Sequence, residues 1–282
     1  MAAVLGTNVA SLWASKNLQS AQSNMANSVE RLSSGLRINR ARDDAAGLGI
    51  SNALTQQINS ADQGVRNLND GISIAQTAEG AMAQASEMAQ RILTLAVQAT
   101  NGSLNTTQKN SIQAQMSALI TAIDSINTRT KFSDTTLLAG TTITIYTGSS
   151  TAESVSISSA ALATISSASG GLAATLSGWI TSASGTTNAA TYQSVATFAA
   201  AYITALDTQR GALGAIQNQM DYSVSNITEL SANLSSARSR VIDTDYATET
   251  SKLTKGQILQ QAATAMLAQA NQMPNVILSL LK

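Results

Sequence analysis

The chain has 282 residues with 16 basic and 16 acidic side chains, so its formal net charge is zero, and it contains neither cysteine nor histidine. A balanced charge gives no reason to expect nucleic acid or an anionic membrane as a partner, because both are recognised through an excess of Lys and Arg. Without Cys and His, disulfides, thiol nucleophiles, Ser-His-Asp triads and zinc sites with nitrogen or sulfur ligands are excluded. We therefore expect no enzyme and no cofactor or metal site.

The remaining composition favours long helices. Pro274 is the only proline, so no proline interrupts a helix before it. The N-terminus shows no basic segment followed by an apolar one, and no apolar run reaches the roughly 18 residues of a membrane span. Neither a secretory signal nor a membrane helix is therefore expected, and on these grounds alone the expected location is the cytoplasm.

Charge divides the chain symmetrically. Residues 1–29 carry one charge, that of Lys16, and residues 256–281 carry none. Residues 141–200 carry only Glu153 and consist mostly of Ser, Thr, Ala and Gly. The order along the chain is thus an apolar end, a charged flank, a bland centre, a second charged flank and a second apolar end.

The two flanks have the apolar spacing of long packed helices. Apolar residues alternate in steps of mostly three and four from Ile58 to Ile92, with Glu79 as the polar break, and again from Ile203 to Leu234. Sustained spacing of this kind predicts supercoiled helices that lie side by side.

Turn signals divide the centre. The first flanking helix is expected to end near Asn101-Gly102, and the next to begin near Thr106 or Thr107. Residues 141–147 and 154–158 alternate β-branched or aromatic residues with small polar ones, which predicts a β-hairpin.

A helix over residues 258–281 would be apolar on most of its faces, so it must be buried. Each large side chain left in water forgoes about 1.5–3 kcal/mol. The N-terminal segment is a plausible partner, but two helices cannot cover each other on all sides, and copies of the chain must complete the burial. The residues predicted to pack in this way are Leu5, Val9, Leu12, Leu259, Ala263, Met266, Ala270, Met273, Ile277 and Leu280.

Carboxylates near the two flank boundaries do not form a catalytic pair. Asp43 and Asp44 are adjacent, so on a helix they point about 100° apart. Residues 243–245 begin like a calcium loop but lack its third ligand, its glycine and its distant glutamate. We expect helix caps and ion pairs in a charged elbow between helices. The residues of this predicted elbow are Arg37, Arg40, Asp43, Asp44, Arg238, Arg240, Asp243 and Asp245.

The two ends of the chain also resemble a known family, the bacterial flagellins, which are the subunits of the flagellar filament. The N-terminal strings that carry the resemblance are residues 30–39 (ERLSSGLRIN), 43–48 (DDAAGL), 67–73 (NLNDGIS), 76–80 (QTAEG) and 95–101 (LAVQATN). The C-terminal strings are residues 210–218 (RGALGAIQN), 237–241 (ARSRV), 243–247 (DTDYA), 257–262 (QILQQA), 266–271 (MLAQAN) and 278–281 (LSLL). The resemblance covers about residues 1–140 and 200–282, and the centre matches nothing comparable.

The resemblance implies a mainly α fold in which both chain ends form long antiparallel coiled-coil helices, with a small β-containing central insert. Residues 1–42 with 244–282 would form the terminal coiled-coil domain in the filament core. Residues 43–140 with 200–243 would form a helical bundle with a β-hairpin near its boundary, and residues 141–199 a variable outer insert.

Function and partners follow from the same resemblance. Flagellins polymerise outside the cell into a helical tube used for swimming, after export in unfolded form through the flagellar type III apparatus without a cleaved signal. This expectation replaces the cytoplasmic one, and a chain without cysteine suits it. The implied partners are neighbouring copies, the filament cap, the hook-filament junction proteins and a cytoplasmic export chaperone, with no nucleic acid and no membrane.

Flagellins are also ligands of Toll-like receptor 5, which implies a receptor contact around residues 90–95. Gln90, Arg91 and Leu95 match the family's receptor-active pattern. Leu93 stands where a basic residue is usual, and Thr94 and Gln115 stand where glutamates are usual. We therefore expect weaker signalling than from a flagellin that carries those carboxylates.

Two other functions are compatible with parts of the pattern. A hook-filament junction protein shares similar terminal helices, although the intact string at 257–271 and the Leu-Leu ending favour the filament subunit. A secreted coiled-coil adhesin would form a discrete oligomer in place of an open polymer.

Overall fold

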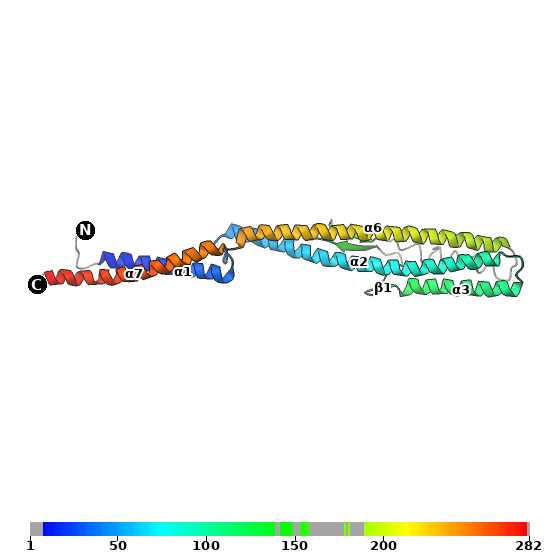
Figure 1. Cartoon of the computed structure of the whole chain (residues 1–282), viewed down its shortest axis with the longest axis horizontal. Coiled ribbons are helices and arrows are strands. Elements are labelled where there is room, and N and C mark those ends of the chain that lie inside the picture. Colours follow the sequence, from blue (N-terminus) through cyan, green and yellow to red (C-terminus); the bar gives the residue numbers. More distant parts are fainter. Residues whose placement is uncertain are drawn as a thin grey trace. The chain divides into compact units, whose positions relative to one another are not determined.

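Helices make up most of the structure. The computed structural model describes residues 8–138, 142–148, 153–157, 178, 180 and 189–280. The helices and strands, labelled in Figure 1 where there is room, are α1 (Val9–Ser34), α2 (Ala45–Ala99), α3 (Thr106–Arg129), β1 (Lys131–Phe132), β2 (Thr135–Thr136), β3 (Ile143–Tyr146), β4 (Ser154–Ile157), α6 (Ala189–Ile242) and α7 (Tyr246–Leu280). The expected mainly α fold with a small β portion is confirmed.

The chain divides into two units. We call Met1–Gln56 with Asn233–Lys282 the terminal unit, and Gln57–Ala232 the central unit. Helix α2 begins in the terminal unit and ends in the central unit, and helix α6 begins in the central unit and ends in the terminal unit.

Helix ends follow local signals in the sequence. Gly35 ends α1 at a φ of +72°, where glycine meets no Cβ penalty, and its N–H donates to the Arg31 carbonyl at 2.9 Å. α3 begins with a capping box in which the Asn105 side chain accepts the Gln108 N–H and the Gln108 side chain accepts the Asn105 N–H. The predictions that one helix ends near Asn101 and another begins near Thr106 are confirmed.

In the terminal unit, α1 and α7 lie side by side and antiparallel (Figure 1). The Asn8 side-chain amide donates to the Ala270 carbonyl at 2.8 Å, and the Ser28 hydroxyl donates to Glu249 at 2.7 Å. The start of α1 therefore meets the later part of α7, and the end of α1 meets its beginning. This pair is the antiparallel coiled coil that the two chain ends were predicted to form.

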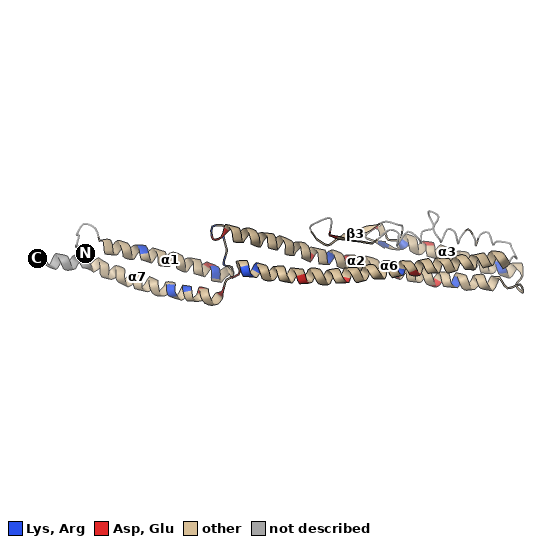
Figure 2. Cartoon of the chain, turned by 90° about the horizontal axis from the view of Figure 1, so that it is seen from above, with Lys and Arg blue, Asp and Glu red and all other residues tan. Residues whose placement is uncertain are grey.

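The central unit packs α2, α3 and α6 around one core (Figures 1 and 2). The heptad positions of α2 and α6 face inward, and two of their polar members meet: the Gln217 side-chain amide donates to the Glu79 carboxylate at 2.9 Å. The fully enclosed members of this core include Leu68, Met82, Ile92, Met116, Ile123, Leu206, Leu213 and Met220.

A β-hairpin packs against this bundle. Strands β3 and β4 pair antiparallel with Ile145 opposite Val155, which confirms the predicted hairpin. Its end lies so close to α2 at Gly64 that a Cβ there would collide with the Thr147 carbonyl, and the Asn67 side chain donates to the Tyr146 carbonyl at 2.9 Å. Glycine in α2 is therefore what lets the hairpin approach the helix.

A second, shorter hairpin, β1–β2, was not located from the residue pattern. It turns at Ser133 and Asp134, which have φ values of 44° and 71°. Two consecutive residues with positive φ make the tight turn that matches the twist of a hairpin.

Several residues of the predicted insert 141–199 belong to the central core. Ile157 on β4 and Tyr192 on α6 are completely enclosed, and Ile180 is nearly so. Most of the insert, including residues 158–177, lies outside the described residues, and so does the prediction made for it.

Candidate functional site: the terminal helix pair and its elbow

Helices α1 and α7 meet along a seam that alternates small and large side chains. Small residues recur every seven positions on both helices, and a Cβ added at Gly256 would lie 3.4 Å from that of Met25. Small seam residues let two helices approach closely. The residues that the partner helix covers at least in part are Ser11, Ala14, Leu18, Ala21, Met25, Ser28 and Leu32 on α1, and Glu249, Leu253, Gly256, Gln260, Ala263, Leu267 and Ala270 on α7.

Large apolar side chains on both helices point away from this seam. Val9, Leu12 and Trp13 on α1, and Ile258, Leu259 and Met266 on α7, are between 47% and 63% exposed. Figure 2 shows that the charged residues of α7 lie near its beginning, and none follows Lys255 within the helix. Each helix therefore keeps apolar side chains that its partner does not cover. On α1, the Lys16 ammonium lies over the Trp13 ring, 5.2 Å from its centroid.

The residues predicted to pack in the filament core divide accordingly. Ala270 is buried in the seam and Ala263 is half-buried there, whereas Val9, Leu12, Leu259 and Met266 are exposed. Leu5 lies outside the described residues, and so do the side chains of Met273, Ile277 and Leu280.

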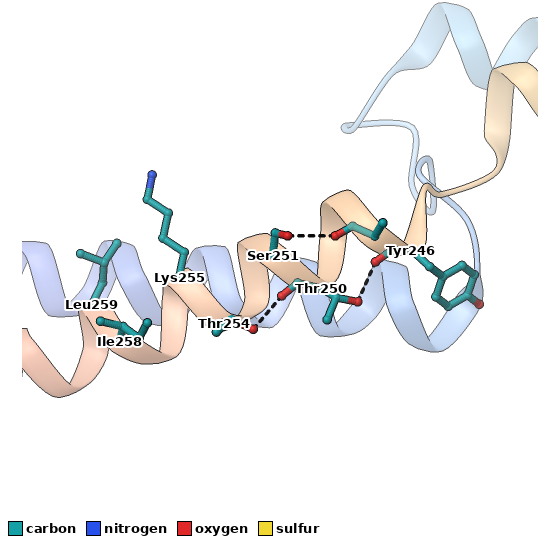
Figure 3. Close-up of a pocket in the computed structure, with 8 residues that line it drawn as sticks. Tyr246, Thr250, Ser251, Thr254, Lys255, Ile258 and Leu259 are labelled. Carbon is teal, nitrogen blue, oxygen red and sulfur yellow. Dashed lines mark hydrogen bonds between the residues drawn. The ribbon is translucent and has the colours of Figure 1, made fainter.

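Two grooves follow these exposed faces. One, of about 470 Å³, runs between the helices and includes Trp13, Ala14, Leu259 and Met266 in its wall. The second, of about 780 Å³, follows the start of α7 from Tyr246 to Leu259 (Figure 3).

The hydroxyl groups along the second groove are already satisfied. Thr250, Ser251 and Thr254 each donate to the carbonyl of the residue four positions earlier (Figure 3). A partner that covers this surface therefore leaves none of these three donors without an acceptor. Burial of these three hydroxyl groups then costs little free energy.

One carboxylate is buried in the seam. Glu249 is 5% exposed, and it accepts hydrogen bonds from the Ser28 hydroxyl at 2.7 Å and from Lys252 Nζ at 3.1 Å, with Arg31 at 3.9 Å. Burial raises the pKa of Glu249, but these hydrogen bonds and the two cations outweigh it, so the pKa lies below its usual 4.5. The burial of Glu249 was not predicted from the sequence, although its spacing of seven from Gly256 places it on the seam.

The two chain ends are also joined by their backbones at the elbow. Leu36 and Asp243 form an antiparallel β-bridge, flanked by the Thr244 N–H donating to the Gly35 carbonyl at 2.9 Å and the Arg37 N–H donating to the Ile242 carbonyl at 2.6 Å. The Arg37 guanidinium donates to the Val241 carbonyl. A Cβ at Gly35 would lie 3.2 Å from the Tyr246 hydroxyl, so glycine there serves both its backbone angle and this packing.

The predicted elbow aspartates hold backbone turns and helix starts. Asp44 accepts the Gly47 N–H at 2.8 Å and caps α2, and Asp245 accepts the Ala247 N–H at 2.9 Å and caps α7. Asp43 accepts the N–H groups of both Asn39 and Arg40.

These contacts lower two pKa values. The Arg40 N–H is the main cause of the low pKa of Asp43, helped by the Asn39 N–H and by Arg42 and Arg31 against some desolvation. The hydroxyl and N–H of Thr248 are the main causes of the low pKa of Asp245.

The predicted elbow arginines have other partners. Arg40 pairs with Glu30 at 2.9 Å, Arg238 donates to Thr55 at 3.4 Å, and Arg240 donates to Ser236 at 2.9 Å. Among the described residues, the one salt bridge of the Asp43 carboxylate is with the Arg42 guanidinium, at 3.8 Å. The elbow is therefore held mainly by backbone bonds and caps, and its ion pairs are peripheral.

The predicted receptor contacts are split by burial. Gln90 and Arg91 are exposed on α2 of the central unit, whereas Leu95 is 3% exposed and packs in the core. In this conformation Leu95 is not accessible to a partner.

Within the part of the chain that the structure describes, no three His, Cys, Asp or Glu side chains are grouped so that they could hold a metal ion. No helix in the described ranges has the length and apolar character needed to cross a bilayer.

Known proteins resemble this chain along its length. Residues 5–142 match the bacterial flagellin N-terminal helical region, and residues 197–281 match the bacterial flagellin C-terminal helical region. Flagellin B of Vibrio cholerae is 34% identical over the whole of both chains, and flagellin of Bacillus subtilis is 37% identical over 98% of each. A crystal structure of Bacillus cereus flagellin covers 61% of this chain and 94% of its own with a TM-score of 0.47 and 23% identity. The paired helices of the two chain ends are thus those of a recognised protein family, and the chain belongs to the bacterial flagellins.

Proposed function

We propose that the exposed apolar faces of α1 and α7 are the surfaces through which copies of this flagellin pack against one another in the filament. The observation that carries the proposal is the exposure of Leu12, Trp13, Ile258 and Met266 on a helix pair whose seam is already filled by other side chains. Burial of one such side chain is worth about 1.5–3 kcal/mol. A second copy presents the same kind of apolar surface and can cover these faces.

The proposal gives the domains their roles. Residues 1–42 and 244–282 would form the filament core, and residues 43–140 and 200–243 would surround it. Residues 141–199 would include the outermost part. The chain would serve as a structural subunit without enzymatic activity, in keeping with a family of structural proteins.

The test is reassembly followed by electron microscopy. Purified full-length protein is dissociated by heat and cooled with filament seeds, beside a shortened chain that ends at Thr254. Long tubes from the full chain and none from the shortened chain are expected, because the shortened chain lacks most of the exposed face of α7. A discrete small oligomer from the full chain would contradict the proposal and favour a hook-filament junction protein or a secreted adhesin.

Export is the second part of the proposal. A chain that is threaded unfolded must hide its apolar helix before assembly, so we expect a cytoplasmic chaperone to cover α7 and the filament cap and hook-filament junction proteins to receive the chain outside the cell. Binding of the chaperone should be lost in the same chain that ends at Thr254. Unchanged binding would place the chaperone on another segment.

A contact with Toll-like receptor 5 is the third part. Exposed Gln90 and Arg91 support such a contact, while the burial of Leu95 and the absence of carboxylates at Thr94 and Gln115 weaken it. In a reporter-cell titration, this flagellin should signal at higher concentrations than one with both glutamates. Equal potency would contradict this expectation.

A further inference from the structure

The turn between α2 and α3 contains a sequence with its own chemistry. Asn101-Gly102 is the one Asn-Gly step in the chain. Both residues are exposed, and both lie between the end of α2 at Ala99 and the start of α3 at Thr106. We propose that Asn101 is a site of spontaneous deamidation, which converts this turn into a mixture of aspartate and isoaspartate as the protein ages.

The reacting groups are adjacent and open to solvent. The Asn101 side-chain oxygen accepts the Ser103 N–H at 3.0 Å, which folds the side chain back over the backbone of Gly102. A Cβ added at Gly102 would meet no atom within 4 Å, so the space on the side-chain side of Gly102 is open. Among the described residues, the Gly102 N–H has no hydrogen-bond acceptor that would oppose its reaction.

The step balances without any added reagent except water. The Gly102 nitrogen gives its proton to solvent base and attacks Cγ of Asn101, so a C–N bond closes a five-membered imide. The Cγ–Nδ2 bond breaks, and the side-chain nitrogen leaves as ammonia after taking up a proton. Water then opens the imide at either carbonyl, which gives aspartate or isoaspartate.

Asn105 in the same turn provides an internal comparison. It is also exposed, but its side chain is committed to the capping box of α3, and the next residue is the β-branched Thr106. Both features oppose the same ring closure, because the cap fixes the side chain and the branched residue crowds the attacking nitrogen. Asn105 should stay intact while Asn101 reacts.

The product changes the electrostatics of the turn. A new carboxylate at Asn101 lies just beyond the C-terminus of α2, which is unfavourable, and just before the N-terminus of α3, which is favourable. The whole chain, whose formal charge is zero, becomes negative. The isoaspartate form also reroutes the backbone through the side chain and breaks the contact with the Ser103 N–H.

The experiment follows the intact full-length chain over days at mildly alkaline pH by ion exchange and peptide mapping. An acidic form should accumulate with the acid located at Asn101, and ammonia should be released in equal amount. In Gly102→Ala, whose new methyl group meets open space, the reaction should slow by about ten-fold, equivalent to a barrier higher by about 1.4 kcal/mol.

Gly80→Ala is the matched control, because its methyl group also meets no atom within 4 Å but lies far from Asn101 in sequence. It should leave the rate unchanged. An acidic form that fails to appear, that maps to another asparagine, or that appears equally fast in Gly102→Ala would overturn the proposal.

Discussion

The central and terminal units contain helices with the same heptad spacing, yet they bury it to different extents. In the central unit, Leu68, Met82 and Ile92 on α2 are completely enclosed. In the terminal unit, Leu12, Leu259 and Met266 remain about half exposed or more. The central unit has a third helix and a hairpin to close its core, whereas in the terminal unit α1 and α7 pack mainly against each other. Heptad spacing therefore specifies which helices pair, and the number of packed elements decides how much apolar surface remains.

The largest effect on stability is expected when a large side chain in the core of the central unit is shortened. Ile92→Ala should lower the free energy of unfolding by about 2–5 kcal/mol, because the cavity lies in a core with no solvent access. Denaturant unfolding followed by circular dichroism would measure it. A loss as small as that of a surface substitution would show that the central core is loosely packed.

The buried carboxylate of Glu249 in the terminal unit should make the stability of that unit depend on pH. The pKa of Glu249 is lower in the folded chain than its ordinary value of 4.5. Its contribution to stability is therefore complete above pH 4.5 and is lost as the pH falls through the lower, folded value. Glu249→Gln keeps an oxygen that can accept from Ser28 but cannot titrate, so its stability should decline less steeply in acid.

Tryptophan fluorescence can report this difference. The two tryptophans are Trp13 and Trp179, so Trp179→Phe leaves Trp13 on α1 as the single probe. Acid titrations of this background with and without the Glu249→Gln substitution should diverge below the ordinary glutamate pKa of 4.5, while Asp43 and Asp245 contribute equally to both. Parallel curves would mean that Glu249 does not couple protons to the helix pair.

A smaller effect on stability is expected for the hydrogen-bonded pair of Glu79 and Gln217 between α2 and α6. Gln217→Leu removes the donor to Glu79 and leaves a partly buried carboxylate without it, which should cost about 1–3 kcal/mol. Glu79→Leu combined with Gln217→Leu should recover much of that loss, since two apolar groups then face each other. A double-mutant cycle measures the coupling, and additive losses would show that the pair is not coupled.

The smallest effect on the isolated chain is expected at an exposed face. Met266→Ser should change the free energy of unfolding by less than about 0.5 kcal/mol, because the side chain is 63% exposed. The same substitution should reduce the yield of tubes on seeded cooling. Unchanged assembly would remove Met266 from the proposed packing surface and sharpen where that surface lies.

Much of the fold could be predicted from the sequence because local signals agreed with the final packing. Asn101-Gly102 marked the end of α2, and the capping residue Asn105 lies directly before α3. Alternating β-branched residues marked β3 and β4. The shorter β1–β2 hairpin has only Ser133 and Asp134 at its turn, without the glycine that usually signals such a turn.

The seam of α7 was harder to predict, since a helix apolar on most faces has more than one possible stripe. Of the α7 residues predicted to pack, Ala263 and Ala270 lie in the seam, whereas Leu259 and Met266 are exposed. Leu253, Gly256 and Leu267 also face α1. Small side chains such as Gly256 permit the closest approach, so they determine the pairing even though they are the least apolar. The elbow bridge is made by backbone groups, which every residue carries, so Gly35 is the one residue of the bridge whose type could have predicted a special conformation there.

The elbow bridge has a consequence for mechanical load. Because α1 and α7 run antiparallel, a force that draws the free ends of the two helices apart first strains the contact between Asn8 and Ala270. The separation then passes the Ser28–Glu249 bond before it reaches the backbone bonds at Gly35 and Thr244. The contacts are thus loaded one after another, and the backbone hydrogen bonds of the elbow bridge at the closed end are loaded last.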